Sequence, residues 1–206
     1  MIYPDNCGKK LTALAGAVLL SSSLGLAQAG QQPSGPAGQS NPAADSQMSA
    51  MTMAGQPSPQ DKTFVKKALQ GGMAEVQLGQ LTLQKSSNDQ VKQFAQKMID
   101  DHTRMGEQMK PVAQQLGVPE PASVSRKDLA VMTKLKTLSG PAYDQAYIKD
   151  MVKDHKQDLS DFQTEASSGK DQTVKDAASQ GSKVIAQHLE MIQQIAKDQN
   201  VNMASK

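Results

Sequence analysis

The feature that most constrains the fold is the helical spacing of apolar residues from position 61 to position 200. Apolar side chains recur every three or four residues in long stretches, no stretch alternates as a strand does, and turn residues separate the stretches. Only 3% of the residues are aromatic, which disfavours a β-sandwich or a barrel. The pattern predicts long helices over 61–86, 89–116, 141–167 and 171–198, and a short helix over 126–137.

Four amphipathic helices of this length predict an all-α, antiparallel four-helix bundle, with the short helix as an extra element between the second and third long helices. Each apolar stripe is too narrow to be stable alone in water, so the helices must face one another. We expect the bundle to cover residues 61–200 and residues 201–206 to form a disordered tail.

The first 29 residues have the organisation of a signal peptide. Lys9 and Lys10 precede an apolar run from Leu11 to Leu26, and a cleavage motif ends at Ala29. We therefore expect cleavage after Ala29 and export to the periplasm of a Gram-negative bacterium or beyond. The run has about 16 residues, fewer than the roughly 20 that cross a bilayer, so we expect no stable membrane span after cleavage.

Residues 30–60 consist mainly of Pro, Gly, Ser, Gln and Ala, a composition that predicts a disordered linker. The linker contains three closely spaced methionines, Met48, Met51 and Met53. They form a weak candidate site for copper, because soft thioether sulfur suits Cu(I). The alternative is that methionine is merely tolerated in a linker.

The net charge and the cysteine content disfavour two classes of function, nucleic-acid binding and cysteine chemistry. The chain has 22 basic and 20 acidic residues, a net charge of +2, which disfavours nucleic-acid binding. The single cysteine, Cys7, lies in the signal peptide, so the mature chain has no thiolate ligand and no cysteine nucleophile. An envelope protein partner and a homo-oligomer both remain open.

The three histidines of the chain fall on three different predicted helices. His102, His155 and His188 each lie in the apolar stripe of their helix, about 14 to 17 residues from its start. In an up-and-down bundle of equal helices they therefore share one central layer. Glu75 occupies the same level on the first long helix.

Three imidazoles and one carboxylate suit one divalent transition-metal ion, Zn(II), Fe(II) or Mn(II), with copper a poorer fit. We therefore interpret Glu75, His102, His155 and His188 as candidate metal ligands. Four aspartates near the layer are candidates to orient an imidazole by accepting a hydrogen bond from the ring nitrogen that does not bind the ion. They are Asp101, Asp144, Asp154 and Asp158. The alternative is a metal-free histidine–carboxylate layer that fixes the register of the helices.

Several short motifs resemble a known family. They are Asp61-Lys62-Thr63-Phe64-Val65, Gly71-Gly72-Met73-Ala74-Glu75-Val76, Val91-Lys92-Gln93-Phe94-Ala95 and Lys153-Asp154-His155. Over about residues 61–196 the chain resembles the ferritin-like four-helix domain of unknown function found in exported bacterial "predicted outer membrane" proteins. The resemblance implies an exported, ferritin-like bundle and no established reaction.

Di-iron ferritin-like enzymes carry a Glu-x-x-His motif on each of two helices. Here Ile99 and Ile185 lie three residues before His102 and His188, so we do not expect a standard di-iron centre. An enzyme is the least favoured class, because the sequence shows no Ser–His–Asp constellation. The sequence thus predicts a periplasmic binding or stress-protection module that holds one metal ion. The alternative is a metal-free structural or interaction protein of the cell envelope.

Overall fold

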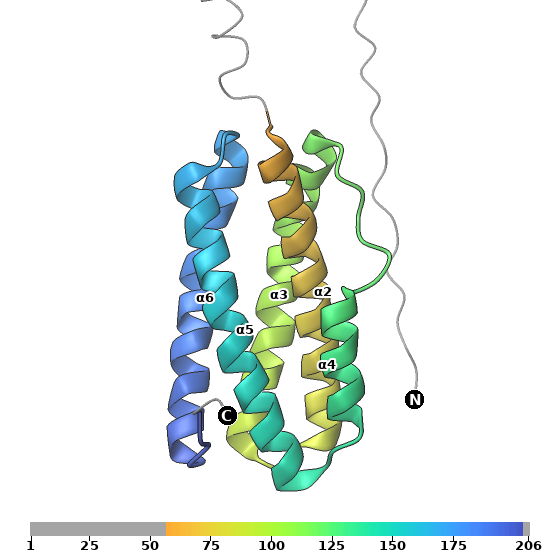
Figure 1. The fold of residues 1–206 in the computed structure, drawn as a ribbon, viewed down its shortest axis with the longest axis vertical. Helices are drawn as coiled ribbons and strands as arrows, with labels where there is room; N and C mark the ends of the chain where they lie inside the picture. Colours follow the sequence, from red (N-terminus) through yellow and green to blue (C-terminus); the bar gives the residue numbers. More distant parts are fainter. Residues whose placement is uncertain (1–56, 204–206) are drawn as a thin grey trace, which may run out of the picture. The chain divides into compact units, whose positions relative to one another are not determined.

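The computed structural model describes residues 57–203, which form five helices and no strand (Figure 1). The helices are α2 (Pro59–Lys85), α3 (Asp89–Leu116), α4 (Arg126–Lys136), α5 (Gly140–Ser168) and α6 (Gln172–Asp198). The predicted all-α class and the short extra helix are confirmed, and the predicted helix boundaries lie close to the observed ones.

The four long helices form a bundle of two hairpins, α2–α3 and α5–α6 (Figure 1). α3 packs against α6 and α2 against α5, while α4 lies outside, against α2 and α5. The connection from α3 to α5, which contains α4, runs back along the bundle, so that α3 and α5 point the same way (Figure 1). The topology is therefore an antiparallel bundle with one long crossover, whereas the sequence analysis assumed a simple up-and-down order.

Local signals fix where the helices begin and end. Ser58 and Asp61 form a capping box at the start of α2, and the Asn88 side chain accepts backbone hydrogen bonds at the start of α3. Gly117 ends α3 in the left-handed conformation with φ 66°, which favours glycine. These caps fix where α2 and α3 begin and where α3 ends.

Two apolar clusters fill the bundle, one towards each end, and leave its middle to polar residues. One cluster includes Leu78 and Phe94, and the other includes Val65, Phe162 and Ile185. The stretches of α2, α3, α5 and α6 that join the two clusters carry the three histidines and Glu75. The functional candidates therefore lie in a polar layer between two apolar clusters.

The second half of α2 does not bury all of its aliphatic residues. Val76 and Leu83 are only half-buried, while Ala74, Leu78 and Thr82 are buried. Small residues line this face because α2 lies close to α3 here: a Cβ added at Gly79 would lie 2.9 Å from the Ala95 carbonyl oxygen. An apolar-residue count cannot detect a face made of small residues.

Some predicted regions border the described part of the chain or lie outside it. The signal peptide at 1–29 and most of the linker at 30–60 lie outside the described residues. The structure differs from the prediction at the end of the linker, because α2 already begins at Pro59. It also differs in the tail, where Val201 is buried against the core. Between residues 57 and 203 no helix has both the length and the apolar character needed to cross a membrane.

Candidate functional site

Three histidines meet in the polar layer of the bundle. His102 comes from α3, His155 from α5 and His188 from α6, and they expose only 6%, 1% and 0% of their surface. Their ring centroids lie 5.4 to 6.1 Å apart. One possible ligand atom of each histidine lies within 4.8 Å of those of the other two. The structure thus brings together the three histidines that the sequence predicts to share a layer.

Hydrogen bonds fix the position of the ring proton in two of the histidines. His155 Nδ1 lies 3.0 Å from the carbonyl oxygen of Met151, which can only accept, so Nδ1 carries the hydrogen and Nε2 keeps the lone pair. His188 Nε2 lies 2.7 Å from Asp101 Oδ2 and donates to it, so Nδ1 keeps the lone pair. His188 Nδ1 and His102 Nε2 are buried and have no hydrogen-bond partner among the described residues.

Burial keeps these imidazoles neutral. It lowers the pKa of His102 to about 3 and that of His155 to about 4, and repulsion from the neighbouring histidines adds to the effect. Burial also lowers the pKa of His188, although Asp101 opposes the shift. A neutral imidazole is the form that offers a lone pair to a metal ion.

Asp101 supports His188 from behind. Its carboxylate also accepts hydrogen bonds from Lys97, at 2.9 Å, and from Arg104. Burial alone would raise the pKa of Asp101, but the hydrogen bonds from His188 and Lys97 outweigh it and lower the pKa to about 2. Asp101 is therefore an ionised acceptor that orients the ring of His188, and it is one of the four aspartates that the sequence offers as candidates for such a contact.

Glu75 belongs to a second group of side chains. Oxygen atoms of Glu75, Asp154 and Asp158 lie within 4.8 Å of one another. Glu75 Oε1 lies 4.0 Å from His155 Nδ1, the ring nitrogen that carries the hydrogen. Burial, and then repulsion from Asp154 and Asp158, raises the pKa of Glu75 well above its ordinary value. The structure therefore places Glu75 beside the histidine cluster, among carboxylates.

The remaining predicted site residues lie in other surroundings. Asp144 is buried on α5, about 16 Å along the helix from His155, so it lies outside both groups. Asp154 forms an ion pair with Lys127 of α4, with Nζ 2.6 Å from Oδ1. The three methionines Met48, Met51 and Met53 lie outside the described residues.

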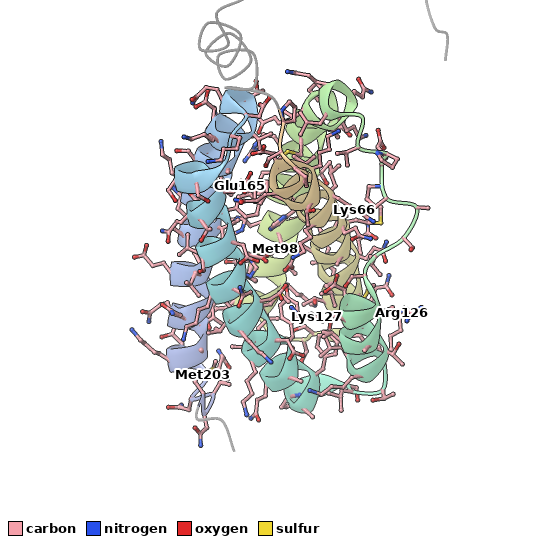
Figure 2. All side chains as sticks on the ribbon, turned by 45° about the horizontal axis from the view of Figure 1, so that its top comes forward. Lys66, Met98, Arg126, Lys127, Glu165 and Met203 are labelled. Carbon is pink, nitrogen blue, oxygen red and sulfur yellow. The ribbon has the colours of Figure 1, made fainter. Side chains whose placement is uncertain are left out.

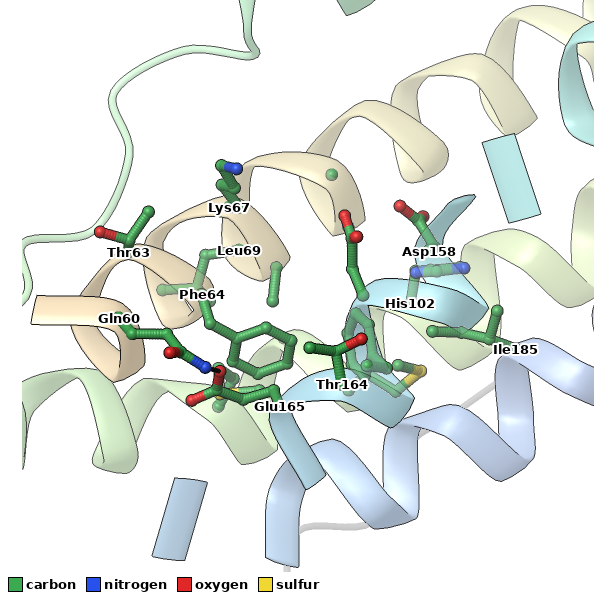
Figure 3. A pocket seen from close by; sticks show the side chains of 18 of the residues that line it. Gln60, Thr63, Phe64, Lys67, Leu69, His102, Asp158, Thr164, Glu165 and Ile185 are labelled. Carbon is green, nitrogen blue, oxygen red and sulfur yellow. Dashed lines mark hydrogen bonds between the residues drawn. The ribbon is translucent and has the colours of Figure 1, made fainter. Parts of the chain in front are cut away.

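A pocket of about 500 Å³ reaches the histidine cluster from the surface. Its walls are largely apolar, with Phe64 and Phe162 among them, and His102 and Asp158 also line it. Figure 3 shows His102 and Asp158 at one end of the pocket. At the other end the Gln60 amide donates a hydrogen bond to Glu165 over 2.9 Å (Figure 3).

The sequence analysis did not predict this pocket, although glycines signal it. Gly71 and Gly72 of α2 and Gly106 of α3 all line the pocket. A Cβ added at Gly72 would lie 3.8 Å from His102 Nδ1, and one at Gly71 or Gly106 would meet nothing within 4 Å. Glycines on two neighbouring helices, at the level of a histidine, leave the space that larger side chains would fill.

Comparison with known proteins identifies a fold and a family. No curated protein matches this chain. One similar crystal structure is that of a protein from Streptomyces coelicolor described as secreted (DUF305), with a TM-score of 0.61, 12% identity, and coverage of 71% of this chain and 98% of that one. A DUF305 fragment from Deinococcus radiodurans has a TM-score of 0.61, 17% identity, and coverage of 69% and 98%.

At these identities the two structures establish a shared helical fold and nothing about activity. The family evidence is separate from the fold comparison and covers most of the chain. A family model described as "Domain of unknown function (DUF4142)" matches residues 46–195, and the chain therefore belongs to this family.

Proposed function

We propose that the bundle is an exported metal-binding module that holds one divalent transition-metal ion between His102, His155 and His188. The observation that carries the proposal is the set of buried ring nitrogens without hydrogen-bond partners, His102 Nε2 and His188 Nδ1. Each unsatisfied buried polar atom costs about 1–3 kcal/mol, a cost that coordination of an ion removes. The fixed hydrogen on His155 Nδ1 adds a third lone pair, on Nε2.

The donor set favours a particular class of ion. Three imidazoles suit Zn(II), Fe(II) or Mn(II), whereas Mg²⁺ and Ca²⁺ prefer oxygen ligands. Asp101 lies behind His188 in the arrangement by which carboxylates orient metal-binding histidines. The Glu75 carboxyl group lies 4.0 Å from His155, next to the three neutral ligands.

The surroundings support a binding or protective role in the periplasm. The three rings are buried, so an ion held there is shielded from solvent, while the pocket of about 500 Å³ gives it a path to His102. The signal-peptide pattern of residues 1–29 supports export. The module would keep a reactive ion bound and away from other reactions, which is a form of stress protection.

A metal-free layer is the second candidate, and the 2.7 Å bond between His188 and Asp101 favours it. That bond satisfies two buried polar groups without any ion and joins α6 to α3. In this alternative the histidines fix helix register, as polar core residues do in coiled coils.

Elemental analysis of the untagged protein, purified from the periplasm without chelator, separates the two candidates. We expect about one equivalent of a single transition metal in the wild type and in the surface control Lys66→Ala, and less than a tenth in His155→Ala. The ion should also raise the melting temperature of the wild type and not that of His102→Ala. The metal-free layer would be established by two results together. The wild type would retain no metal, and no divalent ion or chelator would change its melting temperature.

A further inference from the structure

We propose that Glu75, Asp154 and Asp158 form a second cation site, distinct from the histidine cluster, that binds a hard divalent cation such as Mn²⁺ or Mg²⁺. The three carboxylates come from two helices, Glu75 from α2 and the two aspartates from α5. One oxygen of each lies within 4.8 Å of the others, a spacing that a single cation between them can bridge after small side-chain adjustments.

The burial of Glu75 and its lack of hydrogen-bond partners distinguish this group from an ordinary acidic cluster. The residue is 99% buried, with 1% of its surface exposed, and neither carboxylate oxygen has a hydrogen-bond partner among the described residues. A buried carboxylate without hydrogen-bond donors is costly, because it has given up the hydrogen bonds that it makes in water. A cation between Glu75 and the two aspartates gives both oxygens a partner and balances the charge.

The ion pair already present shows that the group attracts positive charge. Lys127 of α4 reaches Asp154, with Nζ 2.6 Å from Oδ1, and lies between α4 and α5 (Figure 2). The Lys127 side chain is 64% exposed, so this pair is weak and easily exchanged. A divalent cation that coordinates all three carboxylates would therefore displace the ammonium group.

Two cavities border the group. Asp158 lines the pocket of about 500 Å³, and Asp154 and Lys127 line a smaller cavity of about 60 Å³ on the side of α4. An ion can therefore enter and keep water ligands, as Mg²⁺ and Mn²⁺ sites usually do. Oxygen donors favour Mg²⁺ and Mn²⁺, while imidazoles favour Zn(II), Fe(II) and Mn(II). Mn²⁺ is therefore the ion that both groups accept, and a variant that lacks one of the histidines separates the two sites.

The test is a titration of the exported chain with Mn²⁺, in which electron paramagnetic resonance counts the free ion. We expect one Mn²⁺ equivalent to remain bound in His102→Ala, because that substitution removes only the histidine cluster. Glu75→Gln and Asp158→Asn each replace one carboxylate ligand with an amide of the same size, and each should weaken Mn²⁺ binding at least about tenfold. Lys127→Met should strengthen binding, because it removes the competing cation.

Asp144→Asn is the matched control, since it makes the same replacement at a buried aspartate of α5 outside the group and should leave Mn²⁺ affinity unchanged. Unchanged affinity in both Glu75→Gln and Asp158→Asn would overturn the proposal. Loss of Mn²⁺ binding in His102→Ala would overturn it too, by assigning the ion to the histidines. If metal content and melting temperature are the same in the wild type and His102→Ala while Glu75→Gln still weakens Mn²⁺ binding, the function proposed for the histidines fails and the carboxylate site stands.

Discussion

The three buried histidines differ in what holds each ring in place. The Met151 carbonyl holds His155 and the Asp101 carboxylate holds His188, whereas His102 Nε2 has no partner among the described residues. Burial, with repulsion from the other two rings, lowers the pKa of His102 to about 3, while an unfolded chain protonates histidine near pH 6.5. Between about pH 6.5 and pH 3, His102 is therefore neutral in the folded protein and protonated in the unfolded chain.

This difference predicts a pH dependence of stability. The contribution of neutral His102 is fully present above pH 6.5 and is lost as the pH falls towards the folded pKa of about 3. The free energy of unfolding of the metal-free wild type, measured relative to His102→Gln, should therefore fall by about 2 kcal/mol between pH 7 and pH 5. Urea unfolding at both pH values measures it, with Lys66→Ala as the control. A constant difference between wild type and variant would contradict the burial of His102.

The sequence could place the histidines but not the partners of Glu75. Helical periodicity gives the direction of a side chain, and a residue halfway along a helix stays central whichever way the helix runs, so the layer of His102, His155 and His188 was predictable. Periodicity gives neither distance nor rotamer. It therefore could not show that Glu75 lies among carboxylates on the Nδ1 side of His155.

At the scale of elements, Asp61 ties the start of α2 to the turn between α5 and α6. Its Oδ1 accepts a hydrogen bond from the backbone N–H of Lys170 over 2.8 Å, and its Oδ2 accepts one from the Ser58 N–H. Burial alone would raise the pKa of Asp61, but these hydrogen bonds lower it to about 2. The helix start was predictable from the sequence, whereas this contact was not, because it joins residues more than one hundred positions apart.

Asp61→Asn should therefore destabilise the bundle in a pH-dependent way. The lowered pKa contributes about 2 kcal/mol of stability at pH 7, which is lost as the pH falls from about 4 to about 2. We expect the variant to be less stable by about that amount at neutral pH and close to the wild type at pH 2. Chemical unfolding across this range measures the difference, and exposed Asp176→Asn should match the wild type throughout. A loss that is equal at both pH values would assign the effect to packing.

Two glycines of α2 give opposite predictions for the same substitution. A Cβ at Gly79 would lie 2.7 Å from Ile99 Cγ1 and 2.9 Å from the Ala95 carbonyl oxygen, so Gly79→Ala should cost about 1–3 kcal/mol. A Cβ at Gly71 meets nothing within 4 Å, so Gly71→Ala should gain about 0.5–1 kcal/mol from helix propensity. Thermal unfolding of both variants compares them. Similar effects of the two would refute the close contact between α2 and α3.

At the scale of the whole molecule, everything that carries the proposed sites lies within residues 57–203. Both apolar clusters, the histidine cluster and the carboxylate group belong to this part of the chain. The sequence predicted four long helices and one short one because their periodicity and caps are local. The long crossover depends on how distant helices meet, which no local pattern records. The pocket beside His102 is signalled only by glycines on two helices that the fold brings together.

A chain of residues 57–203 should therefore behave as the longer chain does. We expect its melting temperature to lie within about 2 °C of that of the chain starting at Gly30, because no described packing is lost. We also expect it to bind the same number of transition-metal equivalents, measured by elemental analysis after reconstitution. Fewer bound equivalents would instead assign ligands to the removed segment that contains Met48, Met51 and Met53.

The hydrogen bonds of His155 and His188 place the ring hydrogen on different nitrogen atoms, so nitrogen NMR can distinguish the two rings. Because Met151 leaves Nε2 free on one ring and Asp101 leaves Nδ1 free on the other, the two rings are opposite tautomers. Their ¹⁵N resonances differ in pattern, and an ion bound to the lone pairs shifts Nε2 of His155 but Nδ1 of His188. One nitrogen spectrum, recorded with and without metal, therefore reads out both the arrival of an ion and the atoms that hold it.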